Sequence, residues 1–161
     1  MYSPRMDLVS QLLRLVASAG LGLLMGALLA EGALFIPYWR SLSAPSFYAL
    51  HKDWGNRLYL FFAPLTTAST VAAVAAAVVT MIQGGPGRWA SLLAGLASLS
   101  LVAIYFAYFE GGNARLAEAD MKSAELAEEL ARWERWHWTR VLVGIVSFVA
   151  SLLALQPLSG W

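Results

Sequence analysis

Residues 58–82 read LYLFFAPLTTASTVAAVAAAVVTMI, an apolar run without one charged side chain. A helix that crosses the hydrocarbon core of a bilayer needs about 20 such residues. The other stretches that can span a membrane are 15–39, 89–109 and 137–157. The sequence therefore predicts an all-α fold, an integral membrane protein built as an antiparallel four-helix bundle, with residues 1–161 forming a single domain.

The composition limits the class of protein. Apolar residues make up 59% of the chain and charged residues 13%, whereas a soluble domain averages about 25% charged residues. Eleven basic and ten acidic residues leave a net charge of +1, so no bulk charge attracts a nucleic acid. The absence of cysteine excludes disulfides and cysteine-ligated metals. The expected partners are the lipid bilayer and a hydrophobic small molecule.

The connection between the third and fourth spans, residues 110–140, is long and charged. Its apolar residues recur on one helix face, at Leu126, Leu130, Trp133 and His137. We expect an extramembrane amphipathic helix over about 117–136 that continues into the fourth span. The fourth helix is then long, and its first half protrudes from the bilayer. The alternative is an amphipathic helix that lies on the membrane surface.

The distribution of basic residues predicts the orientation. Segments 40–57 and 110–140 contain eight of the eleven basic residues, and the other side holds Arg5, Arg14 and Arg88. Basic residues are enriched on the cytoplasmic side of membrane proteins. We therefore expect a multi-pass protein of the cell (inner) membrane, with segments 40–57 and 110–140 in the cytoplasm.

Polar side chains gather at this same end of the predicted bundle. Glu31 lies nine residues before Arg40, which places it about 13 Å inside the first apolar run. The other three helices contribute His51, Arg57, Glu110, Asn113, His137 and Arg140. A charged carboxylate costs about 2.5–3.5 kcal/mol at the centre of a bilayer. We therefore expect Glu31 to be protonated, paired with a cation or bound to a metal.

This cluster has two interpretations. In the first, Glu31 forms a structural ion pair between helices. In the second, it is a ligand, a proton carrier or an acid–base group. Imidazole and carboxylate groups suit a transition metal such as iron or copper, and the ligand set would be Glu31, His51, Glu110 and His137. The paired Glu-x-x-His motif of diiron bundles is missing, so the alternative is a site with no cofactor.

Aromatic residues accompany the polar ones. Trp133, His137 and Arg140 share one helix face. An aromatic-walled cavity for a planar ligand or cofactor would include Trp133, Trp136, Trp54 and Tyr105. An interfacial aromatic belt, which needs no ligand, explains the tryptophans equally well.

Three short motifs resemble a known family. They are Tyr48-Ala49-Leu50-His51, Asn113-Ala114-Arg115-Leu116 and Trp133-Glu134-Arg135-Trp136-His137-Trp138-Thr139-Arg140. Together with the Gly-rich first helix, they resemble the small four-helix membrane proteins grouped with the anthrone oxygenases, over nearly the whole chain. A few members of that family oxidise anthrone-type polyketides to anthraquinones with molecular oxygen.

The resemblance assigns site positions to Asn113, Trp133, His137 and Arg140. The chain departs from the family pattern before the asparagine, where Glu110-Gly111-Gly112 replaces the usual apolar residue and proline. The resemblance therefore does not define the substrate.

Two functions are consistent with these observations. The first is a membrane-embedded oxygenase or redox protein that acts on a hydrophobic aromatic or quinone-like molecule. Without a cofactor, His137 or His51 would be the base, and Arg140 or Asn113 would stabilise the enolate oxygen. With a metal, the four carboxylate and histidine ligands would hold it. The second function is a non-catalytic accessory subunit that docks on other membrane subunits.

Overall fold

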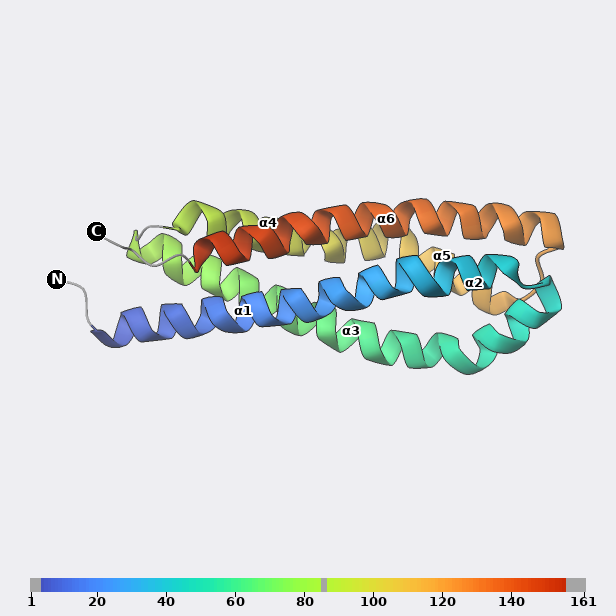
Figure 1. Ribbon diagram of the computed structural model, residues 1–161, viewed down its shortest axis with the longest axis horizontal. Coiled ribbons are helices and arrows are strands. Elements are labelled where there is room, and N and C mark those ends of the chain that lie inside the picture. The colour runs from blue at the N-terminus through green and yellow to red at the C-terminus, as the bar shows by residue number, and fades with distance from the viewer. Residues whose placement is uncertain (1–3, 85–86, 156–161) are drawn as a thin grey trace.

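Four antiparallel helical rods make up the computed structural model, which describes residues 4–84 and 87–155 (Figure 1). The first rod contains α1 (Pro4–Ala30), the π-helical turn η1 (Glu31–Phe35) and α2 (Ile36–Ser41). The second rod is α3 (Ala44–Gln83). The third contains α4 (Arg88–Ile104), the π-helical turn η2 (Tyr105–Phe109) and α5 (Glu110–Glu118), and the fourth is α6 (Ser123–Ala154). The predicted all-α bundle is confirmed.

All four rods of the described chain are long and apolar enough to cross a membrane. By length and composition these helices are Leu8–Ser41, Ala44–Gln83, Arg88–Glu118 and Ser123–Ala154. At 1.5 Å per residue, the 40 residues of α3 extend about 60 Å. The hydrocarbon core is only about 30 Å thick. The protein is therefore an integral membrane protein whose bundle is longer than the bilayer core.

The two ends of the bundle are packed differently. The narrow end, around Gly84 and Arg88, has a core of small side chains: Ala17, Ala73, Ala76, Ala94, Ser98 and Ser147. Helices in lipid associate through such close contacts, because lipid provides no hydrophobic driving force. The wide end, around Ser41, Ala44 and Ser123, has a core of large side chains that includes Phe47, Tyr108, Phe109, Leu130 and Trp133.

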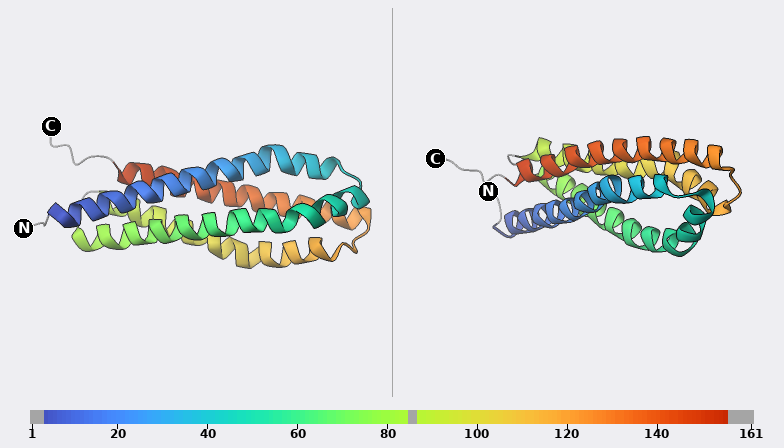
Figure 2. Two further views of the ribbon diagram at one scale, coloured as in Figure 1. Left: turned by 90° about the horizontal axis from the view of Figure 1, so that it is seen from below. Right: turned by 45° about the vertical axis from the view of Figure 1, so that its right-hand side comes forward.

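The fourth helix is long, as predicted, but it begins at Ser123, after a break at 119–122 that follows α5, and it does not protrude by itself. The other rods also continue to the wide end, where the first half of α6 packs beside α2 and α5 (Figures 1 and 2). Leu126, Leu130 and Trp133 of α6 are buried there in one cluster with Phe47 and Leu116. The apolar face predicted for residues 117–136 is thus a core face of the bundle. The position of this half of α6 outside the bilayer stays a prediction, but it is packed against the other rods.

The first half of α3 bows away from the other rods (Figure 2). Pro64 lies inside this helix, and an internal proline removes a backbone hydrogen bond and kinks a helix. At its start, the Ser43 side chain accepts a hydrogen bond of 3.4 Å from the Ser46 N–H, which caps the helix. The very start of α3 returns to the bundle, where Phe47 packs in one cluster with Leu116 of α5.

Candidate functional site

A cavity of about 750 Å³ lies within the wide end, and all four rods contribute to its wall. The wall is mostly apolar, and its aromatic residues are Trp39, Phe47, Tyr48, Tyr59, Phe62, Tyr105, Phe109 and Trp133. Ligand sites usually measure about 300–1,000 Å³ and set a few polar groups into an apolar wall. The cavity therefore has the size and lining of a site for a planar, mostly apolar molecule.

Glu31 is the buried acid of this wall. Only 4% of its surface is exposed. Its Oε2 atom lies 3.2 Å from Nη2 of Arg140 and 3.5 Å from Nδ1 of His137. Both partners belong to α6, so the carboxylate links the first rod to the fourth. Glu31, His137 and Arg140 together form the Glu31 triad.

The hydrogen bonds of His137 show where a proton must lie. Nε2 is 2.9 Å from the carbonyl oxygen of Leu28, and a carbonyl oxygen only accepts, so Nε2 donates. Nδ1 is buried without a hydrogen-bond partner and faces the Glu31 carboxylate. The carboxylate is charge-compensated by Arg140 at 3.2 Å. A proton taken up by Glu31 would lie next to Nδ1, which can accept it.

The local backbone brings this pair together. Glu31 begins the π-helical turn η1, and such turns are frequent at functional sites. The next residue, Gly32, makes room for the imidazole, because a Cβ atom there would lie 3.1 Å from Nε2 of His137. The Glu31-Gly32 dipeptide is thus the sequence signal for this contact.

Arg140 provides a fixed positive charge beside the carboxylate. Its guanidinium carbon lies 4.5 Å from the ring centroid of Phe109 and 5.8 Å from that of Phe62. Both separations are within the range of cation–π attraction. Removing one member of a buried ion pair leaves the other charge uncompensated, so Arg140 and Glu31 stabilise each other in the cavity wall.

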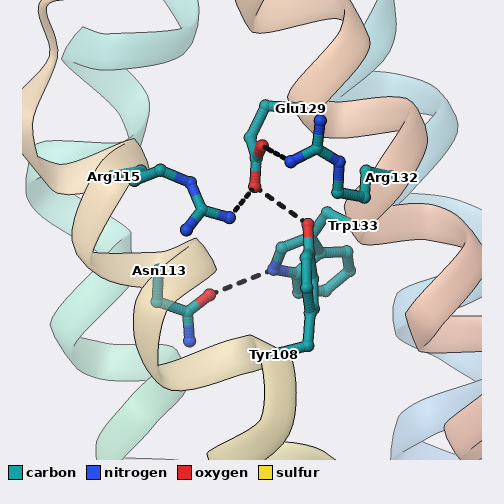
Figure 3. A network of polar contacts seen from close by, with 6 residues as sticks. All are labelled: Tyr108, Asn113, Arg115, Glu129, Arg132 and Trp133. Carbon is teal, nitrogen blue, oxygen red and sulfur yellow. Dashed lines mark hydrogen bonds and ion pairs between the residues drawn. The ribbon is translucent and has the colours of Figure 1, made fainter.

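His51 and Asn113 are polar groups of the other two rods. His51 stacks on Phe47, with 5.4 Å between ring centroids and 15° between planes. Asn113 accepts a hydrogen bond of 3.0 Å from Nε1 of Trp133 (Figure 3). An indole N–H only donates, so the amide oxygen of Asn113 faces Trp133 and its NH₂ group points away. That NH₂ group offers two donors to an oxygen atom of a ligand.

A second buried carboxylate, Glu129, links α5 to α6 beside this wall (Figure 3). It accepts hydrogen bonds from Tyr108 Oη at 2.9 Å and Arg115 Nη2 at 2.6 Å. Arg132 lies 3.4 Å away on the same helix as Glu129. Nothing in the sequence distinguishes Glu129 from the other acids of segment 110–140, except its place next to the buried Leu130. Its role is to hold the two helices that carry Asn113 and Trp133.

Six predicted site residues line the cavity: Glu31, His51, Tyr105, Asn113, Trp133 and Arg140. The structure therefore brings together residues from all four rods, as the sequence predicted. His137 is fully buried and contacts Glu31 without forming part of the wall.

Three predicted residues lie elsewhere. Trp136 stacks on Tyr108, with ring centroids 5.4 Å apart, outside the cavity wall. Trp54 is 48% exposed and has the guanidinium of Arg57 over its ring, as in an interfacial belt. Glu110 is exposed on α5.

The four predicted metal ligands are not assembled into one site. Glu31 and His137 are neighbours, but His51 lies on α3 and Glu110 faces outward. Among residues 4–84 and 87–155, no three histidine, aspartate or glutamate side chains form a group that could hold a metal ion. The remaining neighbour of Glu31 is Arg140, whose positive charge opposes a cation. The residues present therefore do not fit iron or copper.

These features define a class of protein: a four-helix membrane bundle with an aromatic-walled cavity and, at one end, a buried carboxylate beside an arginine and a histidine. A family model for anthrone oxygenase matches residues 54–150, more than half of the chain. The chain therefore belongs to the anthrone oxygenase family. No curated protein and no solved structure matches it. The matched segment includes Asn113, His137 and Arg140, whereas Glu31 and His51 precede it.

Proposed function

We propose that this protein is a membrane-embedded oxygenase that converts a hydrophobic, anthrone-type aromatic ketone into the corresponding quinone. The observation that carries the proposal is the Glu31 triad beside a cavity of about 750 Å³. The family name supports the chemistry of the substrate. An accessory subunit that only docks on neighbours needs no such cavity, so the cavity favours the enzyme.

In this proposal Glu31, rather than a histidine, is the base. Glu31 lines the cavity, whereas His137 lies behind it. The carboxylate removes a proton from the ring carbon opposite the ketone, and the electron pair moves onto the ketone oxygen to form an enolate. The Glu31–His137 pair holds the proton. The NH₂ group of Asn113, together with His51, stabilises the enolate oxygen by hydrogen bonding.

Molecular oxygen is the oxidant. The enolate carbon forms a bond to oxygen, and the resulting peroxide takes the proton held by Glu31 and His137. Loss of the second proton from the same carbon breaks the O–O bond, and the departing hydroxide leaves as water. One ketone and one oxygen molecule thus give one quinone and one water. The apolar wall excludes bulk water from these proton transfers.

The orientation belongs to the same proposal. The wide end carries most of the basic residues, among them Arg40, Lys52, Arg115, Lys122 and Arg132. The positive-inside rule then favours a cytoplasmic wide end in the cell (inner) membrane. The cavity would then lie at the cytoplasmic face of the bilayer. An apolar substrate is concentrated in the bilayer.

The proposal is tested with the full chain in lipid vesicles and anthrone as the substrate. Oxygen uptake and anthraquinone absorbance are measured above the rate in protein-free vesicles. We expect Glu31→Gln to lower the turnover number about 100-fold or more, the usual contribution of a general base. The control is Glu134→Gln, since Glu134 pairs with Arg40 at the same end but outside the cavity wall.

The control variant should keep its rate within about twofold, because an ion pair with exposed partners contributes little. The proposal would be overturned by a wild-type rate equal to that of protein-free vesicles. Full activity of Glu31→Gln would exclude Glu31 as the base.

A further inference from the structure

A smaller cavity of about 180 Å³ adjoins the large one, on the side of the narrow end. Its wall comes from α1, α3, α4, η2 and α6 and includes Leu24, Leu28, Ala63, Thr66 and Leu101. The exposed side chains at this level are apolar, among them Leu23, Leu60, Leu99, Phe106 and Leu142. This part of the bundle therefore lies in lipid, deeper than the large cavity.

The two cavities share part of their walls. The common residues are Tyr59, Phe62, Tyr105 and Arg140. Arg140 also binds Glu31, so the boundary between the cavities lies beside the triad. A molecule with its reacting ring at Glu31 would reach the smaller cavity by extending past these four side chains.

The smaller cavity suits a hydrocarbon chain. Aliphatic and aromatic side chains form most of its wall, and its polar groups are hydroxyls of threonine and tyrosine and the Arg140 guanidinium. A cavity of about 150 Å³ is large enough for benzene. A hydrocarbon chain seated here would gain dispersion contacts with the apolar part of the wall.

We infer that the natural ligand is a planar ring system that carries a short alkyl or prenyl chain. The ring occupies the large cavity, and the chain occupies the smaller one within the membrane. This inference rests on the proposed function, because the ring position is defined by Glu31. It narrows the substrate class from hydrophobic aromatics in general to chain-bearing, lipid-like ring compounds.

The test compares two quinone probes, 2-methyl-1,4-naphthoquinone and its 3-hexyl derivative, in vesicles that contain the full chain. Binding is followed by quenching of tryptophan fluorescence, since Trp39 and Trp133 line the large cavity. Each dissociation constant is expressed as the mole fraction of the probe in the lipid. The stronger partition of the hexyl probe into the bilayer therefore does not affect the comparison. We expect the hexyl probe to bind wild type about tenfold more tightly, because its chain fills the void.

Ala63→Leu fills the smaller cavity without altering the wall of the large one. It should abolish the preference for the hexyl probe and leave the affinity for the methyl probe within about twofold. Thr66→Leu is a second variant of the same design, in case the first folds poorly. The matched control is Ala68→Leu on the exposed side of α3, which should keep the preference.

Equal affinities for the two probes in wild type would overturn the inference, and so would a preference that survives both filling variants. The first result would assign the smaller cavity to an acyl chain of the bilayer. Absence of binding by both probes would contradict the proposed function as well. Binding of the methyl probe alone would contradict only the inference that the ligand carries a chain.

Discussion

Glu31 shows how strongly one residue depends on its neighbours. The carboxylate lies in an apolar rod, yet it has a cation at 3.2 Å and an imidazole at 3.5 Å. The imidazole is in place because its other nitrogen bonds to the Leu28 carbonyl and because Gly32 has no side chain. The Glu31–His137 contact is therefore a property of four residues on two rods.

Substitution of Gly32 tests this dependence. A Cβ atom at position 32 would lie 3.1 Å from His137 and 3.2 Å from Trp138. We expect Gly32→Ala to destabilise the protein by about 1–3 kcal/mol, the usual cost of overpacking, and to lower oxygenase activity. The measurement is thermal unfolding in detergent, followed by the anthrone assay.

Gly26→Ala in the same rod is the control for this substitution, because nothing lies within 4 Å of the added Cβ atom. Alanine favours helix over glycine by about 0.8–1.0 kcal/mol, so this variant should be at least as stable as wild type. Equal stability of the two variants would contradict the packing around His137.

At the same scale, residue chemistry explains which site residues were predictable. A polar side chain in apolar surroundings stands out, and Glu31 was predicted for this reason. Asn113 and Arg140 were predicted from their places next to the third and fourth spans and from the family resemblance. Glu129 and Tyr108 bond to each other in the interior, but their neighbours in the sequence are charged or aromatic as well. Their burial depends on contacts between α5 and α6 that no local pattern encodes.

Among the elements, the two π-helical turns decide which side chains face the cavity. A π-turn adds one residue to a helix and rotates all later residues of that rod by about 100° relative to a regular α-helix. Glu31 starts η1, and Tyr105 and Phe109 bound η2. Glu110 comes directly after η2 and is exposed. Glu110 was predicted from its place directly after the third span, which gives its height in the bundle but not its direction around the helix axis.

The end of α5 supplies a prediction about an element. Ala119 has a φ angle of 56°, in the left-handed region, which costs a residue with a Cβ atom about 1–2 kcal/mol. We expect Ala119→Gly to raise the unfolding temperature, because glycine adopts this conformation freely. Thermal unfolding in detergent is the measurement.

The matched control is Ala114→Gly, on the exposed face of the same helix. Glycine inside a helix is about 0.8–1.0 kcal/mol less favourable than alanine, so this variant should lower the unfolding temperature. A loss of stability in Ala119→Gly as well would show that Ala119 leaves the left-handed region in the membrane.

In the whole molecule, small side chains pack the narrow end and large ones pack the wide end. The first arrangement suits lipid, where close backbone contact stabilises helices. The second resembles the core of a water-soluble bundle, where apolar burial stabilises the fold. The large cavity lies at the end that is packed with large side chains, among them Phe47, Phe109 and Trp133, which also line it.

Single cysteines test this arrangement of the molecule, because the natural chain has none. Lys122→Cys lies at the wide end and Arg88→Cys at the narrow end. With a membrane-impermeant maleimide, we expect the two variants to be labelled from opposite sides of the membrane, Lys122→Cys from the cytoplasm. Labelling of both variants from one side would contradict the four membrane spans. Labelling of Arg88→Cys from the cytoplasm and of Lys122→Cys from the opposite side would reverse only the proposed orientation.

The sequence by itself determined the fold class, the membrane and the end of the bundle that carries the polar groups. These features arise from the length of the apolar runs and from helix connectivity, which are local properties. Only the tertiary structure decided that the first half of the fourth helix packs against the other rods, that Glu110 faces outward and that His137 lies behind Glu31. Each of these depends on helix rotation and on contacts between distant segments. Such contacts arise from packing all four rods at once, and no single stretch of sequence encodes them.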